Sequence, residues 1–247
     1  MIPAHRRGIG STGKMIGLRA AALVFLIVLA WPARADEDDA ALLSYAVAIN
    51  QAAQSRSGTG IYFGNGYVLT ASHVVGRALL KQTNVTIAGR DLPARVVKQD
   101  AFEQSDLALL AIDDRELPTT LRLQRISLCK DPPWPGQDVI TVIPEEAVHS
   151  HVLSPIWLPL DARQYKTVIG DVARTGNSGA GVFDAHKRCL LGIMSRKISQ
   201  VFTDKNTGGK EILDIAKYFV PAAAITEFLP KEILEVESEF APPEIPR

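Results

Sequence analysis

The chain has 247 residues, of which 47% are apolar and 22% are charged, a composition typical of a globular protein with a sizeable core. Its length suits one two-part domain or two small domains. The chain has 27 basic residues (Lys plus Arg) and 27 acidic residues (Asp plus Glu), but residues 1–35 hold five of the basic residues and no acidic one. The remainder therefore carries 22 basic and 27 acidic residues, a net charge of −5. A mildly acidic chain without a basic patch is not an electrostatic nucleic-acid binder, and we expect no nucleic-acid partner.

Residues 1–35 have the organisation of a signal peptide. A basic region ending at Arg19 precedes twelve unbroken apolar residues, 20–31, and small residues stand at Ala33 and Ala35 before an acidic stretch. Twelve residues are fewer than the roughly 20 that a membrane-spanning helix needs, which argues against the alternative of an anchor. We expect cleavage after Ala35, a secreted or periplasmic protein, and no stable membrane insertion after cleavage.

Residues 36–56 form the next predicted segment. Apolar side chains recur at helical spacing and predict a helix over residues 39–53, from Leu42, Tyr45, Ala46, Ile49 and Ala53. This helix either packs on the domain or forms a short pro-segment.

A strand-rich region covers residues 57–130. Asn65 and Gly66 between two β-prone runs indicate a hairpin, and further strands are predicted at residues 84–87, 94–98 and 107–112. His73 follows one strand end, and Asp106 directly precedes the strand at 107–112. A carboxylate at the mouth of an apolar run needs a hydrogen-bonding partner, and a histidine ring N–H would supply it. A turn or capping aspartate is the alternative.

Residues 131–236 form a second strand-rich region. Three prolines among residues 132–135 mark the junction, and strands are predicted at residues 139–143, 157–160, 165–169, 181–183, 189–195 and 212–216. Pro221 is placed to begin a helix that runs through Leu229. Residues 237–247 are predicted to be a disordered tail.

The chain contains two cysteines, Cys129 and Cys189. In an oxidising compartment they predict a disulfide rather than a metal site, because two ligands without suitable histidines make a poor cage. Two buried free thiols are the alternative.

Ser178 stands between glycines in residues 175–181 (TGNSGAG). Such a backbone can turn sharply and expose the hydroxyl, and the amides of Gly176 and Ser178 can then point at one spot where an oxyanion develops. Glycine-flanked serines also fill ordinary turns. The upstream His73 and Asp106, a base and its orienting carboxylate, favour a nucleophile here.

Three segments together resemble the chymotrypsin-like (trypsin-type) serine protease family. Residues 66–73 (GYVLTASH) are similar to its histidine motif, residues 105–110 (SDLALL) to its aspartate motif, and residues 176–179 (GNSG) to its nucleophile motif. They stand in the family's order, and the resemblance spans roughly residues 57–230. It implies an all-β fold of two six-stranded antiparallel β-barrels, here with an N-terminal and a C-terminal helix, and a site in the cleft between the barrels.

The resemblance also implies the chemistry. His73, Asp106 and Ser178 would form the catalytic triad of an endopeptidase that acts on proteins or peptides, with Gly176 and Ser178 as the oxyanion hole and no metal or organic cofactor. Asn177 replaces the aspartate that pairs with a newly cut N-terminus in trypsin-type zymogens, so activation by that ion pair is not expected. This feature resembles bacterial periplasmic heat-shock proteases, although the chain ends too soon to add their PDZ domain.

Substrate preference rests on fewer residues. The family's primary pocket implies roles for Val172, Ala173, Ser195 and Lys197, and Val172 stands where trypsin-like enzymes carry an aspartate, so we expect no basic preference. Val172 with Ala173 suggests a small or apolar side chain. Arg196 and Lys197 could narrow the pocket or attract an acidic residue; facing solvent, the commoner fate of such cations, is the alternative. They also favour the alternative function, a catalytically latent binding or scaffolding protein of the same fold.

Overall fold

The structure is a computed structural model that describes residues 39–51, 54–76, 83–170, 177–203 and 208–234. Two compact units are distinguished, Met1–Ala40 and Ala41–Arg247, and the fold belongs to the second. The predicted signal peptide and the predicted tail at residues 237–247 lie outside the described residues. Within the described ranges, no helix has the length and apolar character needed to cross a bilayer.

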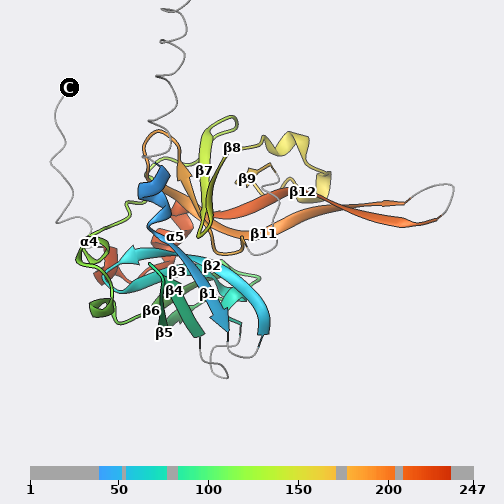
Figure 1. Cartoon of the computed structure of the whole chain (residues 1–247). Helices are drawn as coiled ribbons and strands as arrows, with labels where there is room; N and C mark the ends of the chain where they lie inside the picture. Colours follow the sequence, from blue (N-terminus) through green and yellow to red (C-terminus); the bar gives the residue numbers. More distant parts are fainter. Residues whose placement is uncertain (1–38, 52–53, 77–82, 171–176, 204–207, 235–247) are drawn as a thin grey trace, which may run out of the picture. The chain divides into compact units, whose positions relative to one another are not determined.

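The first half of the unit is a closed barrel of six antiparallel strands in the order β1-β2-β3-β6-β5-β4 (Figure 1). Apolar side chains alternate into its interior, where Val47, Ile49, Tyr62, Val68 and Leu110 are fully buried. Its strands are β1 (Ala46–Gln51), β2 (Gln54–Gly64), β3 (Tyr67–Ala71), β4 (Thr83–Ile87), β5 (Arg90–Gln99) and β6 (Leu107–Ala111).

The second half is a six-stranded sheet in the order β8-β7-β10-β11-β12-β9, followed by helix α5 (Ala222–Phe228). A buried cluster joins the two halves, since Ile61 and Leu69 of the barrel belong to the same core as Ile140, Phe183 and Ile225. Its strands are β7 (Asp138–Ile143), β8 (Glu146–His151), β9 (Val168–Ile169), β10 (Gly181–Asp184), β11 (Leu190–Thr203) and β12 (Lys210–Pro221).

The predicted all-β fold is confirmed, with six strands in each half. The hairpin at Asn65 and Gly66 joins β2 to β3, and both residues have positive φ, 52° and 76°. The C-terminal helix begins directly after Pro221 and buries Ile225 and Phe228, also as predicted. The remaining helical turns are short: α3 (Ser72–Val75), η2 (Asp114–Glu116), α4 (Thr119–Arg122), η3 (Pro155–Trp157) and η4 (Leu160–Ala162).

Two predicted elements are wrong. Residues 39–43 are helical, but the predicted helix over residues 39–53 gives way to β1 at Ala46, which pairs with both β2 and β4. Closure of the barrel by β1 outweighs the helical spacing, because these long-range pairings bury Val47 and Ile49 completely. The predicted strand at residues 157–160 is replaced by η3 and η4, since Pro155 and Pro159 disfavour a strand at this point.

Cys129 and Cys189 form a disulfide with a Cα–Cα distance of 5.1 Å and a sequence separation of 60 residues. The bond ties the segment before β7 to the start of β11. The amide of Cys129 also donates to the carbonyl of Leu190, so backbone pairing supports the same junction.

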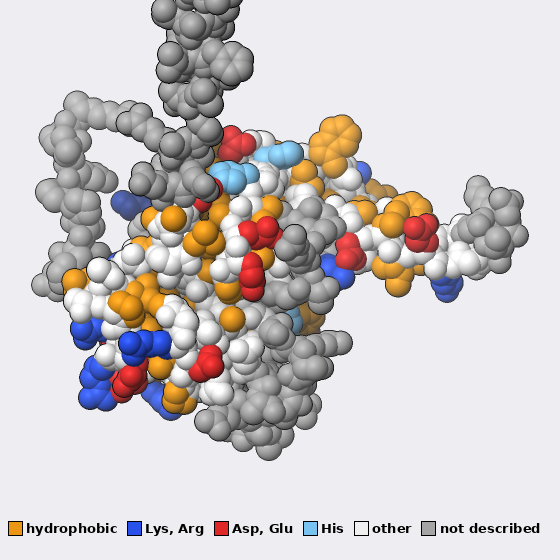
Figure 2. Space-filling view, viewed as in Figure 1, with side chains coloured by type: hydrophobic (Ala, Val, Ile, Leu, Met, Phe, Trp, Pro, Cys, Tyr) orange, Lys and Arg blue, Asp and Glu red, His pale blue; other side chains and the backbone are white. Residues whose placement is uncertain are grey.

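The β11–β12 hairpin extends beyond the neighbouring strands of its sheet (Figure 1). The pair Val201 and Ile212 is more than half exposed, and Figure 2 shows apolar side chains along this projecting hairpin.

Candidate functional site

His73 and Asp106 come together because β3 pairs with β6. The register places Ala71 opposite Leu107, so the residues just beyond these strand ends are neighbours. The amide of Ser72 donates to the carbonyl of Asp106 at 2.9 Å, which continues the pairing one step past the sheet. His73 is the next residue along the chain, in the short turn α3.

The Asp106 carboxylate is fully buried and faces the His73 ring, whose side chain is 34% exposed. The His73 Nδ1 atom lies 2.9 Å from Oδ2 and 3.1 Å from Oδ1, and the His73 backbone amide donates to Oδ1 at 3.1 Å. A buried carboxylate is stable only when such donors satisfy it. The arrangement fixes both the position and the orientation of the imidazole.

Asp106 also has a positive φ of 53°, which few residues other than glycine adopt. Aspartate tolerates this region better than most, and here the backbone amide of Asp106 donates to the carbonyl of Ala101 at 3.2 Å. The turn directs the carboxylate back towards α3 and away from solvent.

Gln99 positions the turn that carries His73, a role the sequence analysis missed. Its side-chain amide donates to the Ser72 hydroxyl at 3.0 Å and to the carbonyl of Gly76 at 2.7 Å. The Ser72 hydroxyl in turn donates to the carbonyl of Asp100. A polar residue at the end of a strand gives no sequence signal for this contact, since it depends on how β5 and α3 lie side by side.

Ser178 is half-buried and is attached to the first barrel through its backbone. Its carbonyl accepts a 2.8 Å hydrogen bond from the amide of Thr59 in β2. Gly179 has a φ of 90°, and a Cβ there would lie 1.9 Å from the Thr59 carbonyl oxygen and 2.3 Å from the Thr70 hydroxyl oxygen. Only glycine therefore allows this close approach, which brings the serine beside β3, the strand that ends next to His73.

The serine is also tied to the second sheet. The amide of Gly179 donates to the carbonyl of Met194 at 2.7 Å, and the amide of Met194 donates to the carbonyl of Ala180 at 2.8 Å. The predicted site residues Gly176, Val172 and Ala173 lie outside the described residues.

Ser195, predicted as a pocket residue, is 1% exposed and donates through its hydroxyl to Oδ2 of Asp106 at 2.5 Å. The cause is a bulge in β11, where Met194 pairs with Phe219 and Arg196 with Tyr218, leaving Ser195 as the extra residue. Asp106 thus receives hydrogen bonds from both halves of the fold. The sequence carries no signal for this contact, because bulges do not follow from residue type.

Lys197, also predicted as a pocket residue, is more than half exposed and forms a 2.6 Å ion pair with Asp214 on β12. Its charge is therefore matched within the β11–β12 hairpin.

Arg196 of β11 links the two halves through Phe102, which lies in the loop between β5 and β6 of the barrel. Its guanidinium stacks 4.2 Å above the ring of Phe102, and Nη2 donates to the Phe102 carbonyl at 2.8 Å. The Phe102 ring meets His73 edge to face, with the ring centroids 5.6 Å apart. Tyr165 and Tyr218 complete the surroundings at 5.8 Å each from the guanidinium carbon. Burial raises the pKa of Tyr218, and the nearby Arg196 charge opposes that rise.

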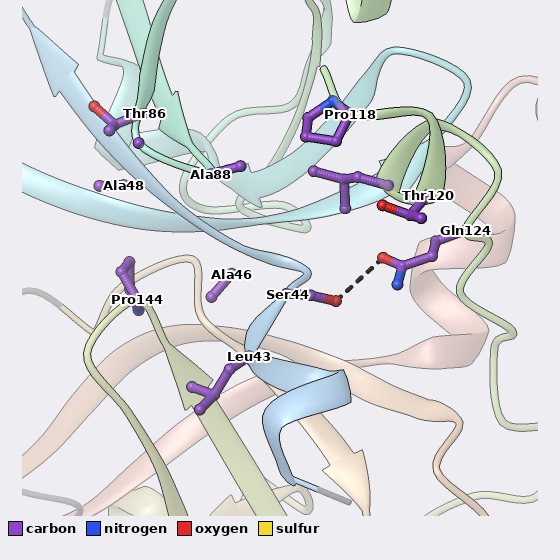
Figure 3. A pocket seen from close by; sticks show the side chains of 12 residues that line it. Leu43, Ser44, Ala46, Ala48, Thr86, Ala88, Pro118, Thr120, Gln124 and Pro144 are labelled. Atoms are coloured by element: carbon purple, nitrogen blue, oxygen red, sulfur yellow. Dashed lines mark hydrogen bonds between the residues drawn. The ribbon is translucent and has the colours of Figure 1, made fainter. Parts of the chain in front are cut away.

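A separate cavity of about 500 Å³ lies among β1, the β4–β5 turn and α4 (Figure 3). Its walls are mainly small or apolar, with a 3.1 Å hydrogen bond between Ser44 and Gln124 at one side. None of its lining residues is a predicted site residue. No group of three or more potential metal ligands occurs among the residues that the structure describes.

The comparisons with known proteins agree with the all-β fold of two halves. Residues 58–193 match the family model of the trypsin-like peptidase domain. A search of curated protein sequences finds no match.

Several solved structures share the fold. The serine endoprotease from Yersinia pestis aligns with a TM-score of 0.57 and 20% identity over 83% of this chain and 68% of that chain. The active form of the Rv3671c protease from M. tuberculosis aligns with a TM-score of 0.51 and 17% identity over 93% and 92% of the two chains. The MamO protease domain from Magnetospirillum magneticum aligns with a TM-score of 0.51 and 23% identity over 76% and 97%.

Identities this low show a shared fold, whereas the family match shows membership because it covers more than half of the chain. The chain belongs to the trypsin-like peptidase family of serine proteases.

Proposed function

We propose that this chain is an exported serine endopeptidase that uses Ser178 as nucleophile, His73 as general base and Asp106 as the orienting carboxylate. The observation that carries the proposal is the pairing of the His73 ring with the buried Asp106 carboxylate at 2.9 Å; the hydrogen bond from Thr59 of the same barrel to the Ser178 carbonyl supports it. An imidazole that donates through Nδ1–H keeps Nε2 free to accept a proton. This is the tautomer that a base in acyl transfer requires.

The proposed reaction follows from these groups. The Ser178 hydroxyl attacks the peptide carbonyl while His73 Nε2 takes its proton, and the imidazolium then gives that proton to the leaving amine. Water then attacks the acyl-enzyme carbonyl while His73 takes its proton and returns it to Ser178, which releases the carboxylic acid product. The amides of Gly176 and Ser178 would hold the oxyanion, and the loss of one such donor typically costs about 10²–10³ in rate.

Export rests on the sequence pattern of residues 1–35 and fits the disulfide between Cys129 and Cys189, since such bonds persist in oxidising compartments. Cleavage after Ala35 predicts Asp36 as the first residue of the mature protein. N-terminal sequencing of the exported protein tests this, and recovery of Met1 or Met15 would contradict it.

A catalytically latent binding protein is the second candidate. It is favoured by the bridge between Arg196 and Phe102, which joins the two halves beside His73. A bridge that a peptide could not displace would leave the triad intact but without access to substrate.

Hydrolysis of an unbiased library of quenched peptides distinguishes the two candidates. We expect cleavage by the purified protein and a rate lower by about 10⁴ for Asp106→Asn, because the amide would favour the wrong imidazole tautomer. The Asp113→Asn variant, which makes the same change at an exposed residue that pairs with Arg115 in its own turn, serves as a control that should retain full activity. Absence of cleavage by well-folded protein would support the latent candidate.

A further inference from the structure

Arg196 is a charged group beside the proposed catalytic base that the triad mechanism does not use. The bulge at Ser195 sends two consecutive residues in different directions, with Ser195 buried against Asp106 and Arg196 placed over Phe102. Since the Phe102 ring also contacts His73, only one aromatic ring separates the guanidinium from the imidazole.

The cation is held by aromatic faces rather than by an acidic partner. Three rings lie within about 6 Å of the guanidinium carbon, the range in which cation–π attraction operates. Among the residues that the structure describes, no acidic side chain forms an ion pair with Arg196. Its neighbour Lys197 differs in this respect, because Asp214 matches its charge at 2.6 Å.

Several donors of Arg196 also lack an acceptor among the residues that the structure describes. A guanidinium carries five N–H groups; here Nη2 uses one on the Phe102 carbonyl, and Nε lies 3.5 Å from the Ser195 hydroxyl. Nη1 and the second hydrogen of Nη2 form the fork that binds carboxylates in bidentate fashion. The side chain is partly exposed, so a ligand can reach it.

We propose that Arg196 determines specificity by binding an Asp or Glu side chain of the substrate within a few residues of the scissile bond. The inference rests on the proposed peptidase function: the Phe102 ring contacts both His73 and Arg196, so a peptide bound for attack at His73 would lie within a few residues of the guanidinium. It adds a preference for an acidic residue to the expectation that the primary pocket takes no basic side chain. The aromatic rings hold the fork in place before the substrate arrives, which lowers the entropy lost on binding.

The test uses quenched peptides in which a single Glu is moved through the three positions on either side of the scissile bond, each with a Gln counterpart. At low ionic strength we expect kcat/KM for Glu over Gln to be about 2- to 5-fold at one position, the range for a partly exposed ion pair. Arg196→Gln should bring this ratio to about one, and its Gln-peptide activity reports whether the variant is folded. Arg196→Lys should restore part of the ratio.

Matched charge changes control the test. Arg90→Gln removes the same group from an exposed position on β5 paired with Glu116, and it should leave the ratio unchanged. Loss of the ratio in Lys197→Gln but not in Arg196→Gln would overturn the proposal, as would a ratio of one at every position in the unaltered protein.

A binding measurement separates this proposal from the proposed function. If no peptide is cleaved, fluorescence anisotropy of the same peptides on the Ser178→Ala protein still reports the Arg196 contact. Tighter binding of a Glu peptide that Arg196→Gln abolishes would support a carboxylate site on a non-catalytic protein. Equal binding of Glu and Gln peptides, or none, would overturn it.

Discussion

His73 and Asp106 stand at the ends of two strands that pair over five consecutive residues of a closed barrel, whereas Ser178 precedes the four-residue strand β10 of the second sheet. On the barrel side, the register of β3 and β6 brings the two residues together, and Gln99 supports the turn that carries His73. On the serine side, the position of Ser178 depends on a few individual contacts. One of them is the approach of Gly179 to Thr59, where an added Cβ would lie 1.9 Å from the carbonyl oxygen.

This difference indicates how the site can vary. A continuous ladder spreads the cost of a substitution over many hydrogen bonds, so single changes within β3 and β6 should leave the His73–Asp106 pair in place. The position of Ser178 depends on few contacts, so a single added methyl group or a lost hydroxyl on this side should lower the reaction rate directly. The following predictions test that contrast.

Gly179→Ala should have the largest effect. The new Cβ would overlap the Thr59 carbonyl and the Thr70 hydroxyl at a φ of 90°, so the serine turn must move away from the barrel. We expect a loss of about 3 kcal/mol in the free energy of unfolding and at least about 100-fold in kcat/KM.

Gly89→Ala is the matched control for this variant, because Gly89 also has a positive φ, 73°, but no atom within 4 Å of an added Cβ. It should cost only about 1 kcal/mol of backbone strain and leave activity unchanged. Equal effects of the two substitutions on activity would contradict the close approach at Gly179.

Removal of the disulfide by the double change Cys129→Ala and Cys189→Ala should lower the free energy of unfolding. A closed loop of this separation stabilises by up to about 4 kcal/mol on the chain-entropy model. Hydrogen exchange should show faster opening of β10 and β11, with β3 and β6 protected as before. Equal loss of protection in both halves would show that they unfold as one unit.

Ser195→Ala removes the hydrogen bond that crosses from β11 to Asp106. A bond to a buried charge contributes about 1.5–3 kcal/mol, so we expect a fall in stability of that order and about a tenfold fall in kcat. Ser199→Ala, which removes an exposed hydroxyl bonded to Asp214, should change neither by more than about 0.5 kcal/mol. A Ser195→Ala protein with full activity would show that the His73 contacts hold Asp106 unaided.

The smallest expected effect is the contribution of Asp184, at the end of β10, to the pH dependence of stability. Burial acts to raise the pKa of Asp184, but hydrogen bonds from the amides of Lys187 and His186 and from the Gln137 side chain lower it overall. A carboxyl whose pKa is lower in the folded state stabilises the protein above its unfolded pKa of about 3.9, and this stabilisation is lost as the pH falls through the folded value.

Asp184→Asn should therefore be less stable than the unaltered protein at pH 7, and the gap should shrink as the pH falls below about 4. Urea unfolding between pH 3 and pH 7 measures this gap. A gap that stays constant over the range would contradict the pKa direction.

The barrel side of the site could be predicted from the sequence, because strand ends carry local signals. Short β-prone and apolar runs locate β3 and β6; Asp106 directly precedes β6, and His73 lies two residues after β3. The hairpin at Asn65, the helix after Pro221 and the pairing of the two cysteines are likewise short-range or compositional patterns.

The contacts that cross between the halves could not be predicted in this way. Ser195 and Arg196 owe their directions to a bulge that depends on the register between β11 and β12, and Gln99 acts through the packing of β5 on α3. The strand β1 was missed for a related reason, since its partners β2 and β4 decide its conformation against the local helical spacing.

Labelling with a fluorophosphonate probe, followed by mass spectrometry of the modified peptide, tests directly whether Ser178 is the nucleophile. The probe requires only an activated serine and an oxyanion hole, so the result does not depend on the choice of substrate. We expect a single adduct on Ser178 that disappears in Ser178→Ala and falls sharply in His73→Ala. A folded protein without an adduct, or an adduct on another serine, would contradict the assignment of Ser178 as the nucleophile.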